Sequence, residues 1–117
     1  MTPMRALVLA GAIFAVQLLP AMAQPAMLFW NRTSATIAGL RLAPAGTTRW
    51  GPNQCENDAD GAVDPGSRLR LSGISPGRYD AEITDRGGRV CSVRGVQVKA
   101  DRPYAFTIAD ADLRNCR

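Results

Sequence analysis

Four carboxylates lie at closely spaced positions in one loop and form the clearest set of candidate ligands in the chain. They are Glu56, Asp58, Asp60 and Asp64. With Gly61 between them, their spacing follows a calcium-binding loop, in which alternate oxygens converge on one cation and glycine permits the sharp turn. The position that should carry a bidentate glutamate is Ser67, and Pro65 prevents an ordinary helix from following. Two interpretations stay open: a calcium site, or a solvated loop of turn-forming Asp and Asn residues.

Trp50 and a set of arginines are the other side chains that could bind a ligand. Trp50 precedes Gly51-Pro52, so its indole either caps the edge of the core or forms an exposed stacking platform for a sugar or peptide. The arginines expected to point outward are Arg41, Arg68, Arg70, Arg86, Arg89 and Arg94. They either pair with carboxylates of neighbouring strands or gather into an anion-binding face, with Arg68 and Arg70 as its candidate anchors. Binding to such a face would weaken with salt.

The chain contains no histidine. This excludes Ser–His and Cys–His nucleophile pairs, histidine-based zinc sites and the usual general base at neutral pH. A hydrolase built on two carboxylates would need a substrate cleft, which a domain of this size hardly supplies. We therefore expect a protein that is not an enzyme and that needs no cofactor, apart from the calcium alternative.

The cysteines bear on both export and stability. Cys55, Cys91 and Cys116 all follow a hydrophobic leader, and disulfides form and persist in exported proteins. Three cysteines allow one bridge and one leftover thiol, with three alternative pairings. Such a bridge typically contributes about 2–4 kcal/mol to the stability of a small domain.

Residues 1–23 are typical of a Sec-type signal peptide. Met1–Arg5 is a short basic start, Ala6–Leu19 is an apolar run, and Ala21-Met22-Ala23 is a small-x-small cleavage site. The run is shorter than the roughly 20 residues of a membrane-spanning helix, and no cysteine at the cleavage site offers a lipid anchor. We expect cleavage after Ala23, a periplasmic or secreted location, and no membrane span in the mature chain, residues 24–117.

The net charge is positive and comes almost entirely from arginine. The formal charge is +4, removal of Arg5 with the leader lowers it by one, and Lys99 is the single lysine. A basic exported protein meets anionic partners such as lipopolysaccharide phosphates or acidic polysaccharides before it meets nucleic acid. We expect the partner to be an envelope protein of unknown identity or an anionic surface, and not a nucleic acid.

Apolar residues of the mature chain alternate with a period of two between turn-forming residues, which is typical of strands. The expected strands are 27–31, 36–43, 48–50, 68–72, 78–84, 89–98 and 104–108. Ile37 is out of phase, so a bulge is expected at Gly39, and a second break in phase occurs at Arg94-Gly95. The pattern predicts a single all-β domain over residues 24–117. We expect an antiparallel β-sandwich of about seven short strands, immunoglobulin-like or barrel-like.

Several short motifs resemble those of a group of small, uncharacterised exported bacterial β-sandwich proteins with SPAG, WGPN and PGxYD motifs. In this chain the motifs are Asn31-Arg32-Thr33, Ala43-Pro44-Ala45-Gly46, Trp50-Gly51-Pro52-Asn53, Pro76-Gly77-Arg78-Tyr79-Asp80 and Asp112-Leu113-Arg114-Asn115-Cys116. The resemblance spans nearly the whole mature chain and implies a fold without implying an activity. It also implies a disulfide between Cys91 and Cys116, which would leave Cys55 as a free thiol or as the partner in an intermolecular bridge.

These observations lead to one main expectation and one alternative. The main expectation is an exported, non-enzymatic β-sandwich that serves as an interaction or structural module in the periplasm or outside the cell. The alternative is a ligand-binding module, for calcium at the acidic loop or for an anionic glycan at an arginine-rich sheet face.

Overall fold

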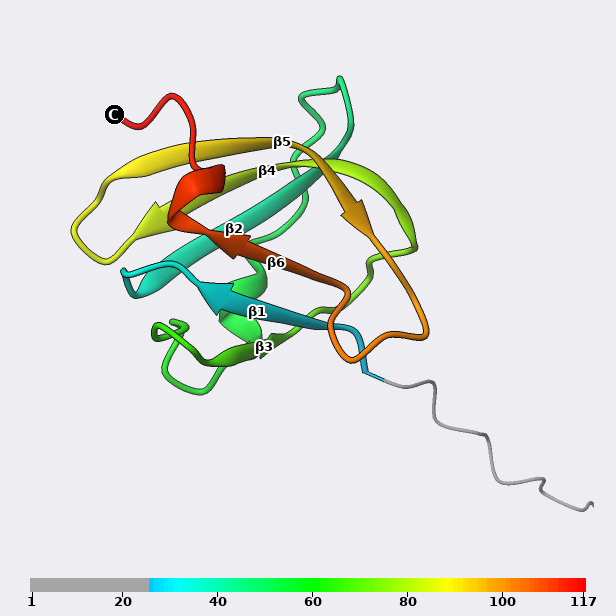
Figure 1. The fold of residues 1–117 in the computed structure, drawn as a ribbon, viewed down its shortest axis with the longest axis horizontal. Coiled ribbons are helices and arrows are strands. Elements are labelled where there is room, and N and C mark those ends of the chain that lie inside the picture. Colours follow the sequence, from blue (N-terminus) through cyan, green and yellow to red (C-terminus); the bar gives the residue numbers. More distant parts are fainter. Residues whose placement is uncertain (1–25) are drawn as a thin grey trace, which may run out of the picture.

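The computed structural model describes residues 26–117, so the expected signal peptide and its cleavage site lie outside the described residues. The described chain forms six strands and two short 3-10 helices (Figure 1). In chain order they are β1 (Leu28–Arg32), β2 (Ile37–Pro44), η1 (Gln54–Asn57), β3 (Arg68–Arg70), β4 (Gly77–Asp85), β5 (Val90–Val98), β6 (Phe106–Ala109) and η2 (Asp110–Asp112). The all-β expectation is therefore confirmed.

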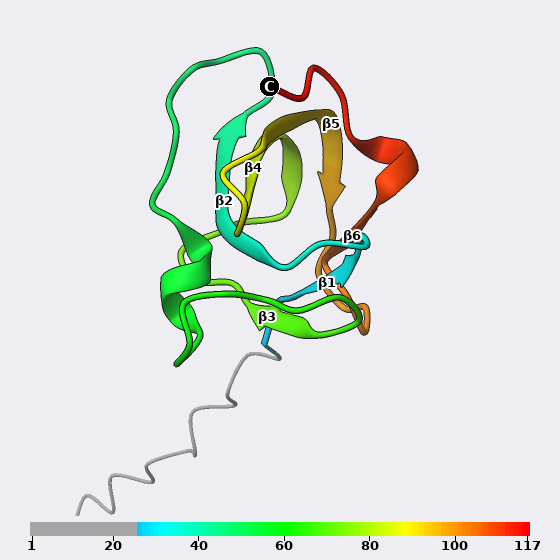
Figure 2. The same ribbon diagram turned by 90° about the vertical axis from the view of Figure 1, so that its left-hand side faces the viewer.

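The strands form two three-stranded sheets, which Figure 2 shows almost end-on. One sheet has the order β3-β1-β6 and the other β2-β4-β5. All pairings are antiparallel except that of β1 with β6, which is parallel and brings the first and last strands side by side. The sheets are mainly antiparallel, as expected, and this one pair differs because local alternation carries no information about which distant strand becomes the neighbour.

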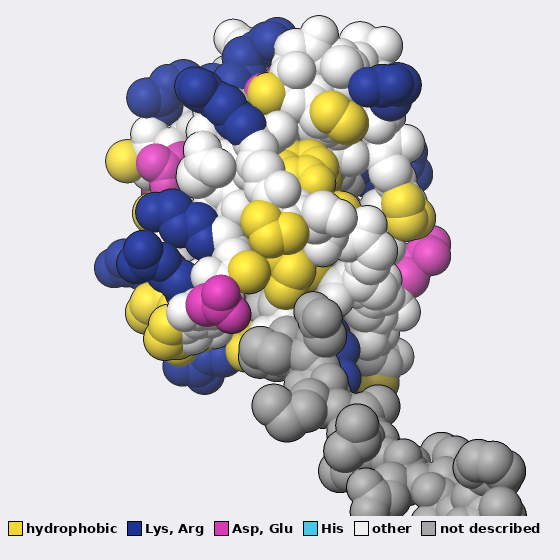
Figure 3. Space-filling model, turned by 90° about the vertical axis from the view of Figure 1, so that its right-hand side faces the viewer, with side chains coloured by type: hydrophobic (Ala, Val, Ile, Leu, Met, Phe, Trp, Pro, Cys, Tyr) yellow, Lys and Arg dark blue, Asp and Glu magenta, His cyan; other side chains and the backbone are white. Residues whose placement is uncertain are grey.

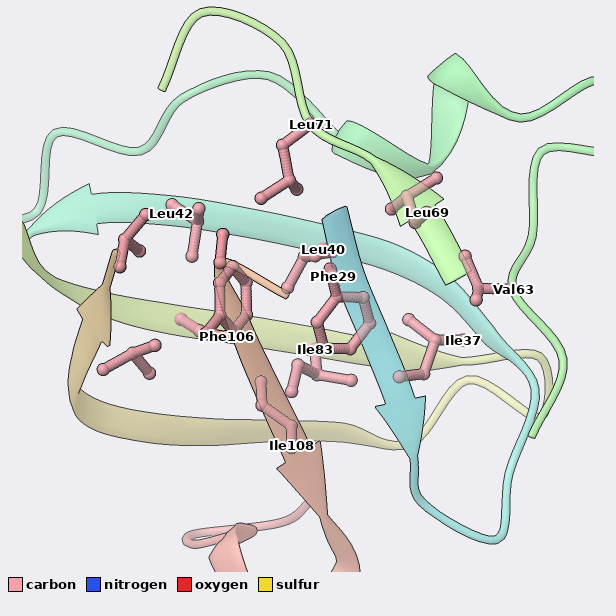
Figure 4. Close-up of a cluster of buried hydrophobic side chains, with 14 of the residues drawn as sticks. Phe29, Ile37, Leu40, Leu42, Val63, Leu69, Leu71, Ile83, Phe106 and Ile108 are labelled. Carbon is pink, nitrogen blue, oxygen red and sulfur yellow. The ribbon is translucent and has the colours of Figure 1, made fainter. Parts of the chain in front are cut away.

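One apolar core lies between the two sheets (Figure 4). Phe29 and Ile108 enter it from the β3-β1-β6 sheet, and Leu40 and Ile83 enter it from the β2-β4-β5 sheet. Leu69 and Leu71 are also buried, whereas Arg68 and Arg70 are exposed, as the alternation predicts. The core also includes Ile37, Leu42, Cys55, Val63, Ala81, Val96, Val98, Ala105 and Phe106.

Two irregularities correspond to the breaks in phase that the sequence indicates. The register of β2 against β4 shifts between Ile37 and Gly39, which turns Ile37 into the core. In β5, Arg94 and Gly95 lie together opposite a single residue of β4, Asp80, and Gly95 has a φ of 68°. This conformation is easily reached only by glycine, so the bulge depends on Gly95.

The expected strand at 48–50 is absent, so residues 26–117 contain six strands where about seven were expected. This segment bonds to itself and to one carbonyl of β2: Trp50 N donates to Thr48 O, and Gly51 N donates to Leu42 O. Strand propensity depends on context, and one bond to the edge strand β2 does not make a ladder. Within residues 26–117, no helix combines the length and the hydrophobicity that a membrane span requires.

Buried polar side chains hold the ends of the strands. Asn31 is fully buried, donates to Ala35 O and Val63 O, and accepts from the backbone and hydroxyl of Thr33. Asp80 accepts from Gly46 N and Gly95 N, and thereby ties the turn after β2 to the bulge in β5. These two backbone bonds, aided by Arg94 and Arg78, lower the pKa of Asp80 below its usual value despite its burial.

Candidate binding face

Two aromatic rings and two guanidinium groups meet on the outer face of the β3-β1-β6 sheet. Trp30 and Tyr104 stack with ring centroids 4.9 Å apart and planes inclined by 31°. The guanidinium carbon of Arg32 lies 5.0 Å from the centroid of Trp30. That of Arg68 lies 5.8 Å from Trp30 and 5.3 Å from Tyr104. We name these four residues the aromatic–arginine cluster.

The two-residue period of β1 produces the cluster. Phe29 points inward, is fully buried and stacks on Phe106 at 4.9 Å, so its neighbour Trp30 must point outward. Trp30 lies directly opposite Arg68 of β3 in the strand register. Side chains directly opposite each other in an antiparallel pair are close enough to interact. Tyr104, just before β6, then completes the stack.

Hydrogen bonds hold the rings in place. The indole Nε1 of Trp30 donates to Gly66 O over 3.1 Å, and Nε of Arg68 donates to the hydroxyl of Tyr104 over 2.8 Å. Each cation–π contact at a partly exposed site contributes about 0.5–1 kcal/mol. The cluster therefore presents ordered aromatic surface and positive charge without a large loss of side-chain entropy on binding.

The six arginines named from the sequence do not share one face. Arg68 and Arg70 lie on β3, Arg41 and Arg94 lie on the other sheet, and Arg86 and Arg89 flank the β4–β5 turn. Arg70 is exposed opposite Leu28 of β1, one strand position beyond the cluster. Of the two alternatives for these arginines, the six do not form a single face, because the spacing of arginines along the chain does not show which sheet each strand joins.

Trp50, the tryptophan singled out from the sequence, lies away from the stacked pair, in the loop between β2 and η1. Its side chain is 38% exposed. Within the motif Trp50–Asn53, the main structural contact comes from Asn53. Its side chain accepts from Leu40 N and donates to Ala38 O. Asn53 also accepts from Cys55 N and so caps η1.

The acidic loop does not gather its four carboxylates. Asp58 accepts from Asp60 N over 2.8 Å, and Asp64 accepts from the hydroxyl of Thr36 over 3.0 Å. Glu56 lies on η1 and is exposed. Within residues 26–117 no group of three or more His, Cys, Asp or Glu side chains is arranged to hold a metal ion. Calcium binding by Glu56, Asp58, Asp60 and Asp64 has no geometric support in this part of the chain.

Cys91 and Cys116 form a disulfide, the pairing that the resemblance implied. It joins the start of β5 to the C-terminal segment. Cys55 is free and fully buried, with its Sγ 3.6 Å from Ile37 O. Burial, with a smaller contribution from Asp58, raises the pKa of the Cys55 thiol to about 11, which keeps it protonated and unreactive at neutral pH.

Sequence reasoning missed Trp30, Tyr104 and Arg32 as candidate binding residues. The signal was available for Trp30, because two adjacent aromatic residues in a strand must face opposite sides of the sheet. Tyr104 could not be found in this way, because it meets Trp30 only through the parallel pairing of β1 with β6.

Comparison of the chain with protein-family models, with curated proteins and with solved structures gives no match.

Proposed function

We propose that the mature chain is an exported, non-enzymatic β-sandwich module that binds an acidic polysaccharide of the cell envelope. The observation that carries the proposal is the stacked pair of Trp30 and Tyr104 with the guanidinium groups of Arg32 and Arg68 beside it. The arrangement of two three-stranded sheets around one core supports the sandwich architecture.

The chemistry of the cluster matches that of an acidic sugar. The faces of aromatic rings offer apolar surface to the C–H groups of a sugar ring, while the polar edges of Trp and Tyr remain hydrated. Arginine guanidinium groups bind carboxylates through paired hydrogen bonds. Arg68 uses its Nε–H to bond the Tyr104 hydroxyl while its guanidinium lies beside the two aromatic rings. The N–H groups at the outer end of the guanidinium can therefore donate to a ligand.

The sequence has no histidine, which favours a binding role over catalysis. The disulfide favours a location outside the cytoplasm. The signal peptide expected at residues 1–23 gives the route of export. The net positive charge favours association with an anionic surface.

The experiment measures binding of residues 24–117 to polygalacturonate, an acidic polysaccharide, with neutral dextran as the control ligand. The chain has two tryptophans, so Trp50→Phe leaves Trp30 as the single fluorescent reporter of the cluster. We expect polygalacturonate to change Trp30 emission at about 20 mM NaCl and much less at about 500 mM, because salt screens the arginine contacts. Dextran should produce no change.

Matched arginine variants separate a specific site from general charge attraction. Arg68→Gln should weaken binding by about tenfold. Arg86→Gln removes the same charge from an exposed turn away from the cluster and should leave the affinity within about twofold. Equal losses in both variants, or no binding of the polysaccharide at low salt, would refute the proposed site.

A further inference from the structure

The edges of the two sheets are closed by the protein's own chain on one flank. There, η1 lies between β2 and β3, as Figure 2 shows on its left side. Asn53 bonds to the backbone of β2 at Leu40 and Ala38, and Asn57 Nδ2 donates to Arg70 O of β3 over 2.8 Å. Gln54 bonds in both directions with the backbone of Ser72. Side-chain amides thus satisfy backbone groups that an edge strand leaves unpaired.

The opposite flank, formed by β5 and β6, is closed only in part. The C-terminal segment pairs with the first part of β5: Val90 and Arg117 exchange two backbone bonds of 3.0 and 2.9 Å, and Ser92 and Arg114 exchange two of 2.8 Å. The Cys91–Cys116 disulfide fixes this segment in place. The coverage ends before the bulge at Arg94 and Gly95.

Beyond the bulge, a groove of about 580 Å³ separates the rest of β5 from β6. In the described chain β5 pairs with β4 and β6 pairs with β1, so each strand forms the edge of its sheet here. At one end the strands are joined by Lys99 N donating to Ala105 O over 3.0 Å. The residues along the groove include Val93 and Val96 of β5, Phe106 and Thr107 of β6, and Tyr104.

The charge of the groove is strongly biased. Three cationic side chains line it: Arg94, Lys99 and Arg102. Its acidic side chain is Asp112, whose Oδ2 already accepts from Ala109 N over 2.9 Å and thereby caps η2. Figure 3 shows basic side chains gathered on one side of this end of the molecule, next to a patch of apolar side chains. A ligand that fits must combine negative charge with apolar side chains.

We propose that this groove binds an extended, acidic segment of a partner protein, which adds as a strand to the free edge of β6. The edge of β6 is the better template, because the bulge at Arg94 and Gly95 interrupts the ladder of β5. In an added strand, alternate side chains would point toward Val96 and Phe106, and the carboxylates between them would meet Arg94 and Arg102. Because β6 spans the 4 residues Phe106–Ala109, about four residues of extended chain match its edge.

The groove is a separate site from the aromatic–arginine cluster, although Tyr104 borders both. Substitutions for a test therefore avoid Tyr104 and use the cationic residues of the groove. Arg102 is exposed in the β5–β6 connection, so a change there leaves the core intact. Arg86, exposed in the β4–β5 turn, provides the matched control.

The test uses a fluorescently labelled eight-residue peptide of alternating Glu and Val, with fluorescence anisotropy as the readout and residues 24–117 as the protein. We expect saturable binding of this peptide and none of the corresponding Lys–Val peptide. Arg102→Glu should weaken binding by about tenfold or more, whereas Arg86→Glu should change it by less than about twofold. Polygalacturonate binding by the Arg102→Glu protein should persist, which keeps the two sites distinguishable.

A second peptide tests strand addition itself. In an extended Glu–Val peptide the N–H groups of all Val residues point to one edge and those of all Glu residues to the other. N-methylation of either set keeps every charge and side chain but removes the backbone donors along one edge. Binding should fall by about tenfold or more for the one methylated peptide that has lost the donors facing β6. Equal affinity for the unmethylated peptide and both methylated ones would overturn the proposal, as would absence of binding, or equal losses in the Arg102 and Arg86 variants.

Discussion

Asp80 should be the most important single carboxylate for stability. It is 9% exposed, and its two oxygens accept from Gly46 N and Gly95 N, each over 3.0 Å. A hydrogen bond to a charged group contributes about 1.5–3 kcal/mol, and two bonds that share one carboxylate do not add fully. We therefore expect Asp80→Ala to lower the free energy of unfolding by about 3 kcal/mol. Asp80→Asn, which keeps one acceptor oxygen, should cost about 2 kcal/mol.

The pH dependence gives an independent check on the cause. The pKa of Asp80 is lowered in the folded protein, chiefly by the two backbone bonds. A lowered folded-state pKa adds stability above the unfolded value, near pH 4, and that stability is lost as the pH falls through the folded pKa. The difference between wild type and Asp80→Asn should therefore be constant from about pH 5 to pH 7 and shrink below about pH 4.

Urea unfolding followed by circular dichroism measures both the loss of stability and its pH dependence. The slope of the unfolding free energy against urea concentration should be the same in all variants. Asp60→Asn, which neutralises an exposed carboxylate in the acidic loop, is the control and should change stability by less than about 0.5 kcal/mol. Two results would refute the reasoning: a loss below about 0.5 kcal/mol for Asp80→Ala, or a difference between wild type and Asp80→Asn that grows toward acid.

Two further predictions concern the cysteines. Burial raises the pKa of Cys55 to about 11, so at pH 8 the folded protein should not react with a thiol reagent. Over the same time, the urea-unfolded protein should react with one equivalent of the reagent. Rapid labelling of the folded protein would contradict the burial of Cys55. Replacing Cys91 and Cys116 together by Ala opens a loop with a sequence separation of 25, and should lower the free energy of unfolding by about 3.5 kcal/mol and increase amide exchange at Val90 and Ser92. An unchanged exchange rate at these two amides would show that the C-terminal segment docks on β5 without the bridge.

The elements that follow from local alternation could be predicted, and those that depend on distant pairing could not. The alternation around Leu69 shows which side chains are buried, and Gly39 marks a bulge, because both depend on neighbouring residues alone. The strand expected at 48–50 does not form, because the bond from Gly51 N to Leu42 O next to it is not extended into a ladder with β2. The aromatic–arginine cluster could not be predicted, because nothing local indicates that β1 lies between β3 and β6. The sequence offered Trp50 and an arginine face only as alternatives to structural roles for the same residues.

Three residues of the short motifs named from the sequence have structural roles in the described chain, so these motifs give no information on activity. Asn31 closes the end of β1, Asn53 joins η1 to β2, and Asp80 ties Gly46 to the bulge in β5. Each is a side chain that bonds to backbone, so its replacement disturbs the fold before it disturbs a surface. Of the aromatic–arginine cluster, Trp30, Arg68 and Tyr104 lie outside these motifs. We therefore expect ligand specificity in this protein to depend on its exposed faces and not on these motifs.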